Sequence, residues 1–289
     1  MIEKMISQQN DFKELKARIK ADAETVSSAL SAALAPGDGS EGFSRLFEAM
    51  DYTAASGGKR VRPFLTLSFC RACGGKDASA LPFALAVECV HTYSLIHDDL
   101  PCMDDDELRR GLPSNHVRFG EATALLAGDG LLTHAFSLCA SNTAVSDRAV
   151  REAVGVLAGY AGPHGMVGGQ QLDLDCAGKK LELGTLFATY RLKTCALIEA
   201  ACSLGMIAAE RFDLTPARQY GEALGIAFQI TDDLLDGDVS ENSVLNCMDA
   251  EEAGKTAFEY TEKAVEAVRE IDRDGTLADF ARMLRDRKN

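Results

Sequence analysis

Two clusters of aspartates are the residues of this chain whose types and spacing are best suited to chemistry. The first is Asp98-Asp99 followed by Asp104, and the second is Asp232-Asp233 followed by Asp236. Each cluster lies in a stretch that is otherwise rich in apolar residues, where carboxylates are rare unless they are paired or bind a metal. Carboxylate oxygens are ligands that hard cations such as Mg²⁺ prefer. Two such clusters facing one another predict bound Mg²⁺ ions, which would in turn bind phosphate groups.

The second cluster has the simpler helix geometry. At 100° per residue, Gln229, Asp232, Asp233 and Asp236 fall within a stripe about 100° wide on one face of a helix. The neighbouring residues of this stretch are Leu, Ile, Ala and Phe, which is too apolar for a solvated surface face. The pattern therefore favours a metal site over an ordinary exposed face.

The first cluster requires a break in its helix. Asp98 and Asp104 would lie on different faces of an unbroken helix, but Pro101 ends the helix between them. A loop at this point could return Asp104 to the side of Asp98. Upstream, His91 and Ser94 follow helical spacing, so His91 is expected about 10 Å below the acids on the same face. A lone histidine on an apolar helix is otherwise a packed core residue, and that alternative stays open for His91.

Basic residues accompany the acids in three places. They are Lys59, Arg60 and Arg62 in the Gly-rich segment 57–63, Arg109-Arg110 after the first acid cluster, and Lys193, which Thr194 follows. A Gly-rich helix start directs free backbone N–H groups at anions. Arginine binds phosphate in a bidentate manner and lysine binds it as a point charge. Together with the acids, these groups predict sites for two phosphorylated ligands.

The elements that must position these residues are helices. Apolar residues recur at spacings of three and four, and strand signals are scarce. We expect an all-α fold of about ten helices in a single domain that spans residues 1–289. The stretches 83–100, 120–141, 185–209 and 217–236 are apolar around much of their circumference and are predicted to be buried. Thr215-Pro216 predicts a helix start with Thr215 as the N-cap.

Composition and charge exclude several classes of function. The 289 residues are 46% apolar, with a formal net charge of −14. The acidic balance argues against a nucleic-acid partner and against stable association with an anionic membrane. No run of 18 apolar residues and no secretory signal are visible, so we expect neither a transmembrane span nor export. The nine cysteines are an odd number, and Cys70-Arg-Ala-Cys73 has no second pair at zinc spacing, so reduced thiols and a cytoplasmic location are expected.

Six ordered sequence blocks carry a resemblance to a known family. The chain resembles the trans-isoprenyl diphosphate synthases, which are the farnesyl and geranylgeranyl diphosphate synthases. The blocks are GGKRVRP (57–63), HTYSLIHDDLPCMDDDELRRG (91–111), HVRFGEATALLAGDGLL (116–132), GGQQLDL (168–174), YRLKT (190–194) and FQITDDLLD (228–236). The resemblance implies an all-helical fold around a deep central cavity, a homodimer and three Mg²⁺ ions.

The resemblance also implies a role for each candidate residue. Isopentenyl diphosphate would be bound by Lys59, Arg62, His91 and Arg110, and the allylic diphosphate by Arg109 and Lys193. The metal ligands would be Asp98, Asp104, Asp232 and, through water, Asp236. Gln170 and Asp173 would support the site, and Thr194 and Gln229 would offer oxygens toward developing positive charge. The reaction would be ionisation of the allylic diphosphate, condensation with the double bond of isopentenyl diphosphate, and loss of a proton.

Product length depends on the depth of the cavity below Asp98. Tyr93 and Ser94 are expected roughly 6–8 Å below that aspartate on the same helix. In the family, an aromatic residue at this position together with the two-residue insertion Pro101-Cys102 goes with a farnesyl product. The alternative is that Tyr93 is a core residue and that the product is geranylgeranyl diphosphate.

One segment departs from the family pattern. Family members carry a lysine in a loop after the second acid cluster, but residues 237–246 contain none. Two other functions therefore stay open. A non-catalytic regulatory subunit would be expected to lose one aspartate motif, and a terpene cyclase would not need a second diphosphate pocket at Lys59, Arg62 and His91.

Overall fold

The fold is built almost entirely from helices, as the sequence predicts. The computed structural model describes residues 12–179, 181–237 and 243–287. The elements in chain order are α2 (Lys13–Ala33), the 3₁₀ turn η1 (Glu41–Phe43), α3 (Ser44–Ala55), α4 (Val61–Ala72), α5 (Asp77–Asp98), β1 (Leu108–Arg109), β2 (Leu112–Pro113), α6 (Asn115–Phe119), α7 (Glu121–Ala140), α8 (Asp147–Ala161), α9 (Met166–Cys176), α10 (Leu183–Thr189), the π-helix η2 (Tyr190–Cys195), α11 (Ala196–Ala208), α12 (Thr215–Asp236), the 3₁₀ turn η3 (Val244–Asn246), α13 (Ala250–Ala267) and α14 (Thr276–Arg285).

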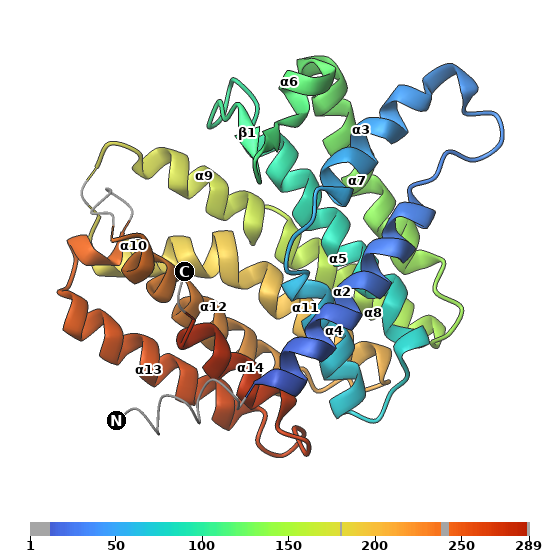
Figure 1. Cartoon of the computed structure of the whole chain (residues 1–289). Helices are drawn as coiled ribbons and strands as arrows, with labels where there is room; N and C mark the ends of the chain where they lie inside the picture. Colours follow the sequence, from blue (N-terminus) through green and yellow to red (C-terminus); the bar gives the residue numbers. More distant parts are fainter. Residues whose placement is uncertain (1–11, 180, 238–242, 288–289) are drawn as a thin grey trace.

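The helices α5 and α11 lie in the middle of the molecule, with other helices around them (Figure 1). Every residue of α11 except the half-buried Glu199 is buried, and α5 contributes a long series of buried apolar side chains to the same core. A second, smaller apolar cluster joins η2, α12 and α13 through residues such as Cys195, Ile226, Ile230 and Ala257. The burial predicted for 83–100 and 217–236, and for the α11 part of 185–209, is therefore confirmed.

Helix α7 corrects one prediction. The stretch 120–141 was expected to be buried all round, but only 33% of its most apolar window is buried. Leu125 and Leu126 are 47% and 56% exposed. The reason is that the contacts of α7 with α3, α5, α6 and α8 leave part of its surface exposed in the described chain. A helix that is apolar around much of its circumference can thus be only half-covered in the single chain.

Two helices, α5 and α7, are long and apolar enough to cross a membrane when only length and composition are considered. Core helices of globular proteins pass the same test. For α5, 67% of the apolar window is buried inside the protein, as in such a core helix.

The predicted helix over 185–209 is interrupted. Residues Tyr190–Cys195 form a π-helix, a widened turn that is frequent at functional sites. Two glycines let neighbouring helices approach this turn closely. A Cβ atom at Gly169 of α9 would stand 2.2 Å from the backbone nitrogen of Lys193, and one at Gly225 of α12 would stand 2.5 Å from Sγ of Cys195.

Helix α12 begins at Thr215, with Pro216 in its first turn, as predicted. The capping group is different, because the backbone N–H of Thr215 donates to the carboxylate of Asp213 at 3.1 Å and Thr215 itself is not the cap. The helix ends at Asp236, where Gly237 takes the left-handed conformation with φ of 60°. The second acid cluster therefore occupies the last two turns of a long, well-delimited helix.

Candidate active site

A cavity of about 550 Å³ lies against the C-terminal half of α5. Eight of the residues singled out in the sequence line it: Arg62, His91, Tyr93, Ser94, Asp98, Gln170, Lys193 and Thr194. They come from α4, α5, α9 and η2, and the outermost two, Arg62 and Thr194, are 132 positions apart in the chain. Much of the remaining wall is apolar and is formed by Leu95, Leu100, Met103, Leu125, Met166, Val167 and Leu174. The cavity is therefore lined both by charged side chains and by apolar side chains.

The first acid cluster folds back on itself as the sequence suggested. The helix α5 ends at Asp98, and the backbone N–H of Asp104 donates to the backbone oxygen of Asp98 at 2.9 Å. Desolvation is the main cause that raises the pKa of Asp98 to about 6. The charge of Lys193 opposes this shift, and the charge of Asp104 adds to it. The pKa of Asp104 is also raised, mainly by desolvation. Such a pair of carboxylates lacks sufficient positive charge within the protein.

Asp99 has a different partner from its two neighbours. Its carboxylate is buried and accepts a hydrogen bond from Nε of Arg109 at 2.9 Å. Arg109 also contacts Asp106 at 3.1 Å. Arg109, which we expected on the allylic diphosphate, is thus held beside the first cluster by Asp99 in this structure.

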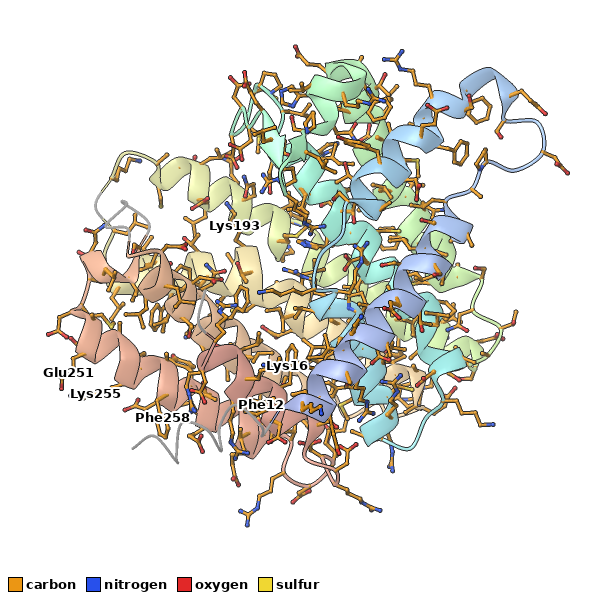
Figure 2. The ribbon with its side chains drawn as sticks, viewed as in Figure 1. Phe12, Lys16, Lys193, Glu251, Lys255 and Phe258 are labelled. Atoms are coloured by element: carbon orange, nitrogen blue, oxygen red, sulfur yellow. The ribbon has the colours of Figure 1, made fainter. Side chains whose placement is uncertain are left out.

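The π-helix places Lys193 opposite the first cluster. Lys193 lies near the centre of the molecule, where η2 faces α9 (Figure 2). Its ammonium group pairs with the carboxylate of Asp173 on α9 at 2.5 Å. The charge of Lys193 also lowers the pKa values of Asp98 and Asp104 against the larger effect of desolvation. Gln170, one turn before Asp173, has a buried amide nitrogen without a hydrogen-bond partner among the described residues. The wall formed by η2 and α9 therefore offers a cation and a free donor to the cavity.

A second group of cations lies deeper along α5. Burial, followed by the charges of Arg62 and Arg110, lowers the pKa of His91 well below its usual value, so this imidazole is neutral at pH 7. The Nε atom of Arg62 is buried and has no hydrogen-bond partner within the described ranges. The guanidinium of Arg110 lies against Gly58, where a Cβ atom would stand 2.9 Å from it, and donates to the backbone oxygen of Gly57. The three side chains form a cluster of donors suited to an anion.

The second acid cluster lies at the end of α12 and is held by other contacts. The carboxylate of Asp232 accepts a hydrogen bond from Arg287, whose guanidinium also stacks on Phe228 with 4.2 Å to the ring centroid. Desolvation raises the pKa of Asp232, and the charges of Arg287 and Lys59 oppose that shift. Asp236 is exposed at the helix end, and Gln229 lies half-buried one turn before Asp232.

Asp233, the middle residue of the second cluster, has partners of its own. Its carboxylate accepts hydrogen bonds from the Tyr190 hydroxyl at 2.5 Å and from the Val244 backbone N–H at 2.6 Å. It therefore joins α12 to η2 and to the turn η3. Half of the lysine-free segment 237–246 that departs from the family pattern, residues 238–242, lies outside the described residues.

Eight predicted site residues are not among those that line the cavity: Lys59, Arg109, Arg110, Asp104, Asp173, Gln229, Asp232 and Asp236. Six of them are nevertheless tied to it. Asp104, Asp173 and Arg109 contact or act on the Asp98–Lys193 region, and Arg110 acts on His91. Lys59 and Asp232 act on one another, and Lys59 is three positions before Arg62 of the cavity wall.

Within the described ranges, no three His, Cys, Asp or Glu side chains come close enough to hold a metal ion by themselves. The carboxylates fit a hard cation in another way. Mg²⁺ is commonly bound by one or two carboxylates together with substrate phosphates. The raised pKa values of Asp98, Asp104 and Asp232 show that each would be stabilised by an added cation.

Sequence reasoning missed three features of the site. Arg60 and Glu88 form a buried ion pair beneath the cation cluster, Asp99 holds Arg109, and Arg287 reaches Asp232. A signal existed for Glu88, because it is a carboxylate within an apolar helix, one turn before His91. No local signal existed for Arg287, which meets Asp232 from 55 positions away.

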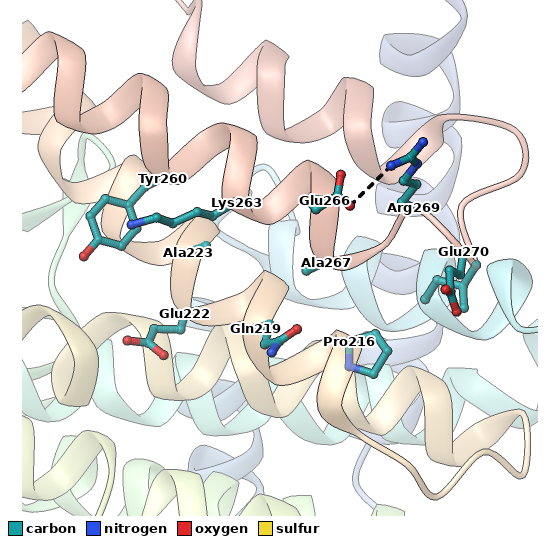
Figure 3. A pocket seen from close by; sticks show the side chains of 11 residues that line it. Pro216, Gln219, Glu222, Ala223, Tyr260, Lys263, Glu266, Ala267, Arg269 and Glu270 are labelled. Atoms are coloured by element: carbon teal, nitrogen blue, oxygen red, sulfur yellow. Dashed lines mark hydrogen bonds and ion pairs between the residues drawn. The ribbon is translucent and has the colours of Figure 1, made fainter.

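A second hollow of about 860 Å³ lies elsewhere, between the first half of α12 and the end of α13 (Figure 3). It is lined by charged residues of both signs, including Glu222, Lys263 and Glu270, and Glu266 pairs with Arg269 at its edge. None of the predicted site residues lines it. The chemistry indicated by the acid clusters therefore belongs to the smaller cavity.

Comparison with known proteins agrees with this geometry. The sequence profile described as polyprenyl synthetase matches residues 44–264, which include all sixteen predicted site residues. This chain belongs to the polyprenyl synthetase family. The predicted family and the predicted all-α isoprenoid synthase fold are thereby confirmed.

Three relatives show how close the likeness is. Farnesyl diphosphate synthase of Escherichia coli is 50% identical over 194 residues, which is 65% of each chain. Geranylgeranyl pyrophosphate synthase 7 of Arabidopsis thaliana is 45% identical over 218 residues, covering 74% of this chain and 60% of the relative. This chain thus spans slightly less than two thirds of either relative. The crystal structure of an FPP/GFPP synthase from Zymomonas mobilis superposes with a TM-score of 0.85 at 34% identity, covering 94% of this chain and 98% of the other.

Proposed function

We propose that this protein is a prenyltransferase that condenses isopentenyl diphosphate with dimethylallyl or geranyl diphosphate to give farnesyl diphosphate. The observation that carries the proposal is the single cavity that Asp98, Lys193 and Arg62 line together with apolar side chains. Family membership and the 50% identity to a farnesyl diphosphate synthase support the same reaction.

The two diphosphates bind in different surroundings. Isopentenyl diphosphate takes the donors of Arg62, His91 and Arg110, together with Lys59. The allylic diphosphate lies between Lys193, Arg109 and the aspartates. Only the second of these positions is surrounded by carboxylates, so only the second needs metal ions to hold an anion there.

Asp98, Asp104 and Asp232 would hold Mg²⁺, with Asp236 contributing through water, and three ions are expected. The metal would neutralise the charge of the leaving diphosphate. Lys193 and Arg109 add fixed positive charge at the same place, which stabilises the departing group without any reorganisation. No nucleophilic side chain is needed for this chemistry.

The apolar wall has its own part in the reaction. Ionisation leaves an allylic cation, and side chains such as Leu95, Met166 and Leu174 exclude the water that would quench it. The hydroxyl of Thr194 and the amide oxygen of Gln229 face the developing positive charge. Asp173 positions Lys193 on the opposite wall, and Gln170 supports the site with its amide donor, which is unpaired within the described part of the chain.

Product length is set by the depth of the cavity below Asp98. Tyr93 lines the cavity with 6% of its surface exposed and packs edge-on against His97 with 5.7 Å between ring centroids. The hydroxyl of Ser94 donates to the backbone oxygen of His91 and leaves Tyr93 as the bulky group on that side. Tyr93 therefore stops the growing chain at the farnesyl length. The other candidate product is geranylgeranyl diphosphate, which the Arabidopsis relative favours.

The working form is a homodimer, and the outer side of α7 is its contact surface. Exposed apolar side chains gather there and on the neighbouring elements: Leu108, Leu112, Val117 and Leu126. In a dimer, the second copy would cover these exposed side chains. Sedimentation velocity would show a dimer for the native protein and a monomer for Leu126→Lys. The nine free cysteines agree with a reducing cytoplasm as the location.

Incubation of the purified protein with Mg²⁺, isopentenyl diphosphate and each allylic starter, followed by sizing of the products, tests the function. Farnesyl diphosphate as the main product, lost on addition of EDTA, is the expected result. Geranylgeranyl diphosphate would select the other product. No product from any starter would contradict the proposal and favour a regulatory subunit, and a cyclic product formed without isopentenyl diphosphate would indicate a cyclase.

A further inference from the structure

Beneath the proposed isopentenyl diphosphate pocket lies a buried ion pair. Nη1 of Arg60 is 2.6 Å from Oε1 of Glu88, and the two side chains are 2% and 3% exposed. Arg60 also donates to the hydroxyl of Ser27 at 3.2 Å and to the backbone oxygen of Ala54. Its guanidinium is thus fully engaged inside the protein, although the sequence places Arg60 between Lys59 and Arg62 of the anion site.

The pair fixes the path of the chain into the site. Arg60 has φ of 46°, in the left-handed region that residues with a Cβ atom rarely adopt. It is the residue at which the Gly-rich loop turns into α4. The inward anchor of Arg60 therefore decides where Lys59, before it, and Arg62, after it, are directed.

Glu88 also acts on the cations that stay in the pocket. It is one helical turn before His91 on α5. Burial lowers the pKa of Arg62 and the pKa of Arg110, and in both cases the charge of Glu88 is the strongest effect in the opposite direction. Arg60, Arg62 and Arg110 are thus three guanidinium groups that share the field of one buried carboxylate.

We infer that Glu88 is a positioning residue of the isopentenyl diphosphate pocket, whose buried charge keeps the arginines together while the pocket is empty. This inference rests on the proposed function, because it takes the cluster of Arg62, His91 and Arg110 to be a diphosphate site. A bound diphosphate would also neutralise the charges of these arginines, from the side of the pocket. Glu88 therefore stabilises the empty pocket and at the same time weakens the binding of the anion.

The test is the affinity for inorganic pyrophosphate in the presence of EDTA, measured by isothermal titration. Without metal, only the cationic pocket binds the anion. Glu88→Gln keeps an oxygen acceptor for Arg60 and removes the charge. We expect a lower melting temperature for the free variant, together with about tenfold tighter pyrophosphate binding, which corresponds to about 1.4 kcal/mol.

Two further variants separate charge from shape. Glu88→Asp keeps the charge, so its pyrophosphate affinity should stay within about twofold of the native value even where its stability is lower. Glu199→Gln removes another half-buried carboxylate, which accepts from Tyr160 at 3.0 Å and has Glu222, Arg218 and Arg191 as charged neighbours. It should leave the affinity unchanged.

The possible results separate the role of Glu88 from the existence of the diphosphate pocket. Unchanged or weaker binding by Glu88→Gln, or tighter binding by Glu88→Asp, would overturn the role of Glu88. If Glu88→Gln does not fold, the Glu88→Asp measurement alone carries that decision. Native protein that binds no pyrophosphate would overturn the diphosphate pocket itself, and the inference would fall with it.

Discussion

The two aspartate clusters look alike in sequence but are built differently. The first is fixed by its own neighbourhood, because the chain turns at Pro101, the Asp104 N–H bonds the Asp98 carbonyl and Asp99 holds Arg109. The second ends a regular helix and is balanced by a residue from the far end of the chain, Arg287. The first cluster is therefore preorganised around the cavity, while the second has a contact that an incoming cation must replace.

The middle aspartates repeat this difference. Asp99 holds a cation, Arg109, beside the first cluster. Asp233 instead joins α12 to Tyr190 and Val244 and so ties the second cluster to the π-helix that carries Lys193. In both clusters the middle acid serves the scaffold, and the outer acids are the ones that we propose as metal ligands.

The largest effect is expected from removing the metal ligand of the rigid cluster. Asp98→Asn should lower kcat by about 10³, because it removes charge stabilisation that acts in the transition state. Steady-state kinetics at saturating Mg²⁺ measures it. Asp99→Asn, which keeps the fold of the loop and perturbs only Arg109, serves as the comparison and should lose clearly less. Equal losses would show that the outer and middle acids are not distinct.

Below the rigid cluster, Tyr93→Ala should change the product. Removal of the ring deepens the cavity beneath Asp98, so geranylgeranyl diphosphate should become the main product from the same substrates. Reversed-phase chromatography of the dephosphorylated products measures the change. An unaltered product length would show that Tyr93 is only a core residue.

A substitution at Gly58 can displace the guanidinium of Arg110 in the cation cluster without changing any charge. Gly58→Ala places a Cβ atom 2.9 Å from the guanidinium of Arg110 and should raise KM for isopentenyl diphosphate about tenfold, the cost of one displaced charged hydrogen bond. Gly57→Ala is the matched control, since Gly57 also has positive φ but its Cβ position is open. KM for the allylic substrate should stay the same in both variants. A rise in both KM values would indicate general damage to the loop.

Removal of the contact between Arg287 and Asp232 of the second cluster should have a smaller effect. Arg287→Ala frees Asp232, so the Mg²⁺ concentration for half-maximal rate should fall by about threefold, a size typical of a partly exposed ion pair. Arg285→Ala, which contacts Glu262 and Asp286 instead, is the control and should show no such change. A higher Mg²⁺ requirement for Arg287→Ala would mean that this arginine assists metal binding.

Stability of the metal-free protein offers the finest comparison. The pKa of Asp98 is raised to about 6, so the folded protein binds this proton more tightly than the unfolded chain. Stability in EDTA should therefore decrease as the pH rises from about 4 through about 6. At pH 8, Asp98→Asn should melt a few degrees higher than the native protein, and Asp232→Asn should gain less because it loses the contact with Arg287. Thermal unfolding followed by circular dichroism measures both, and a larger gain at Asp232 would reverse the comparison.

Local patterns predicted the parts of the site that depend on helix periodicity. The stripe of acids on α12, the common face of His91, Ser94 and Asp98, and the turn at Pro101 follow from spacing alone. The partners of Glu88 and Asp232 could not be predicted, because Arg60 and Arg287 reach them through tertiary packing that no local pattern records. The exposed side of α7 could not be predicted either, since an apolar helix looks the same whether its own chain or a second copy covers it.

The central claim is that both clusters hold the same ions around one diphosphate. Binding of Mn²⁺ in place of Mg²⁺, counted by electron paramagnetic resonance with and without inorganic pyrophosphate, tests it most directly. The account predicts pyrophosphate-dependent Mn²⁺ binding in the native protein that is lost almost completely in either Asp98→Asn or Asp232→Asn. Full binding in one of these variants, or independent losses that simply add, would contradict a shared site.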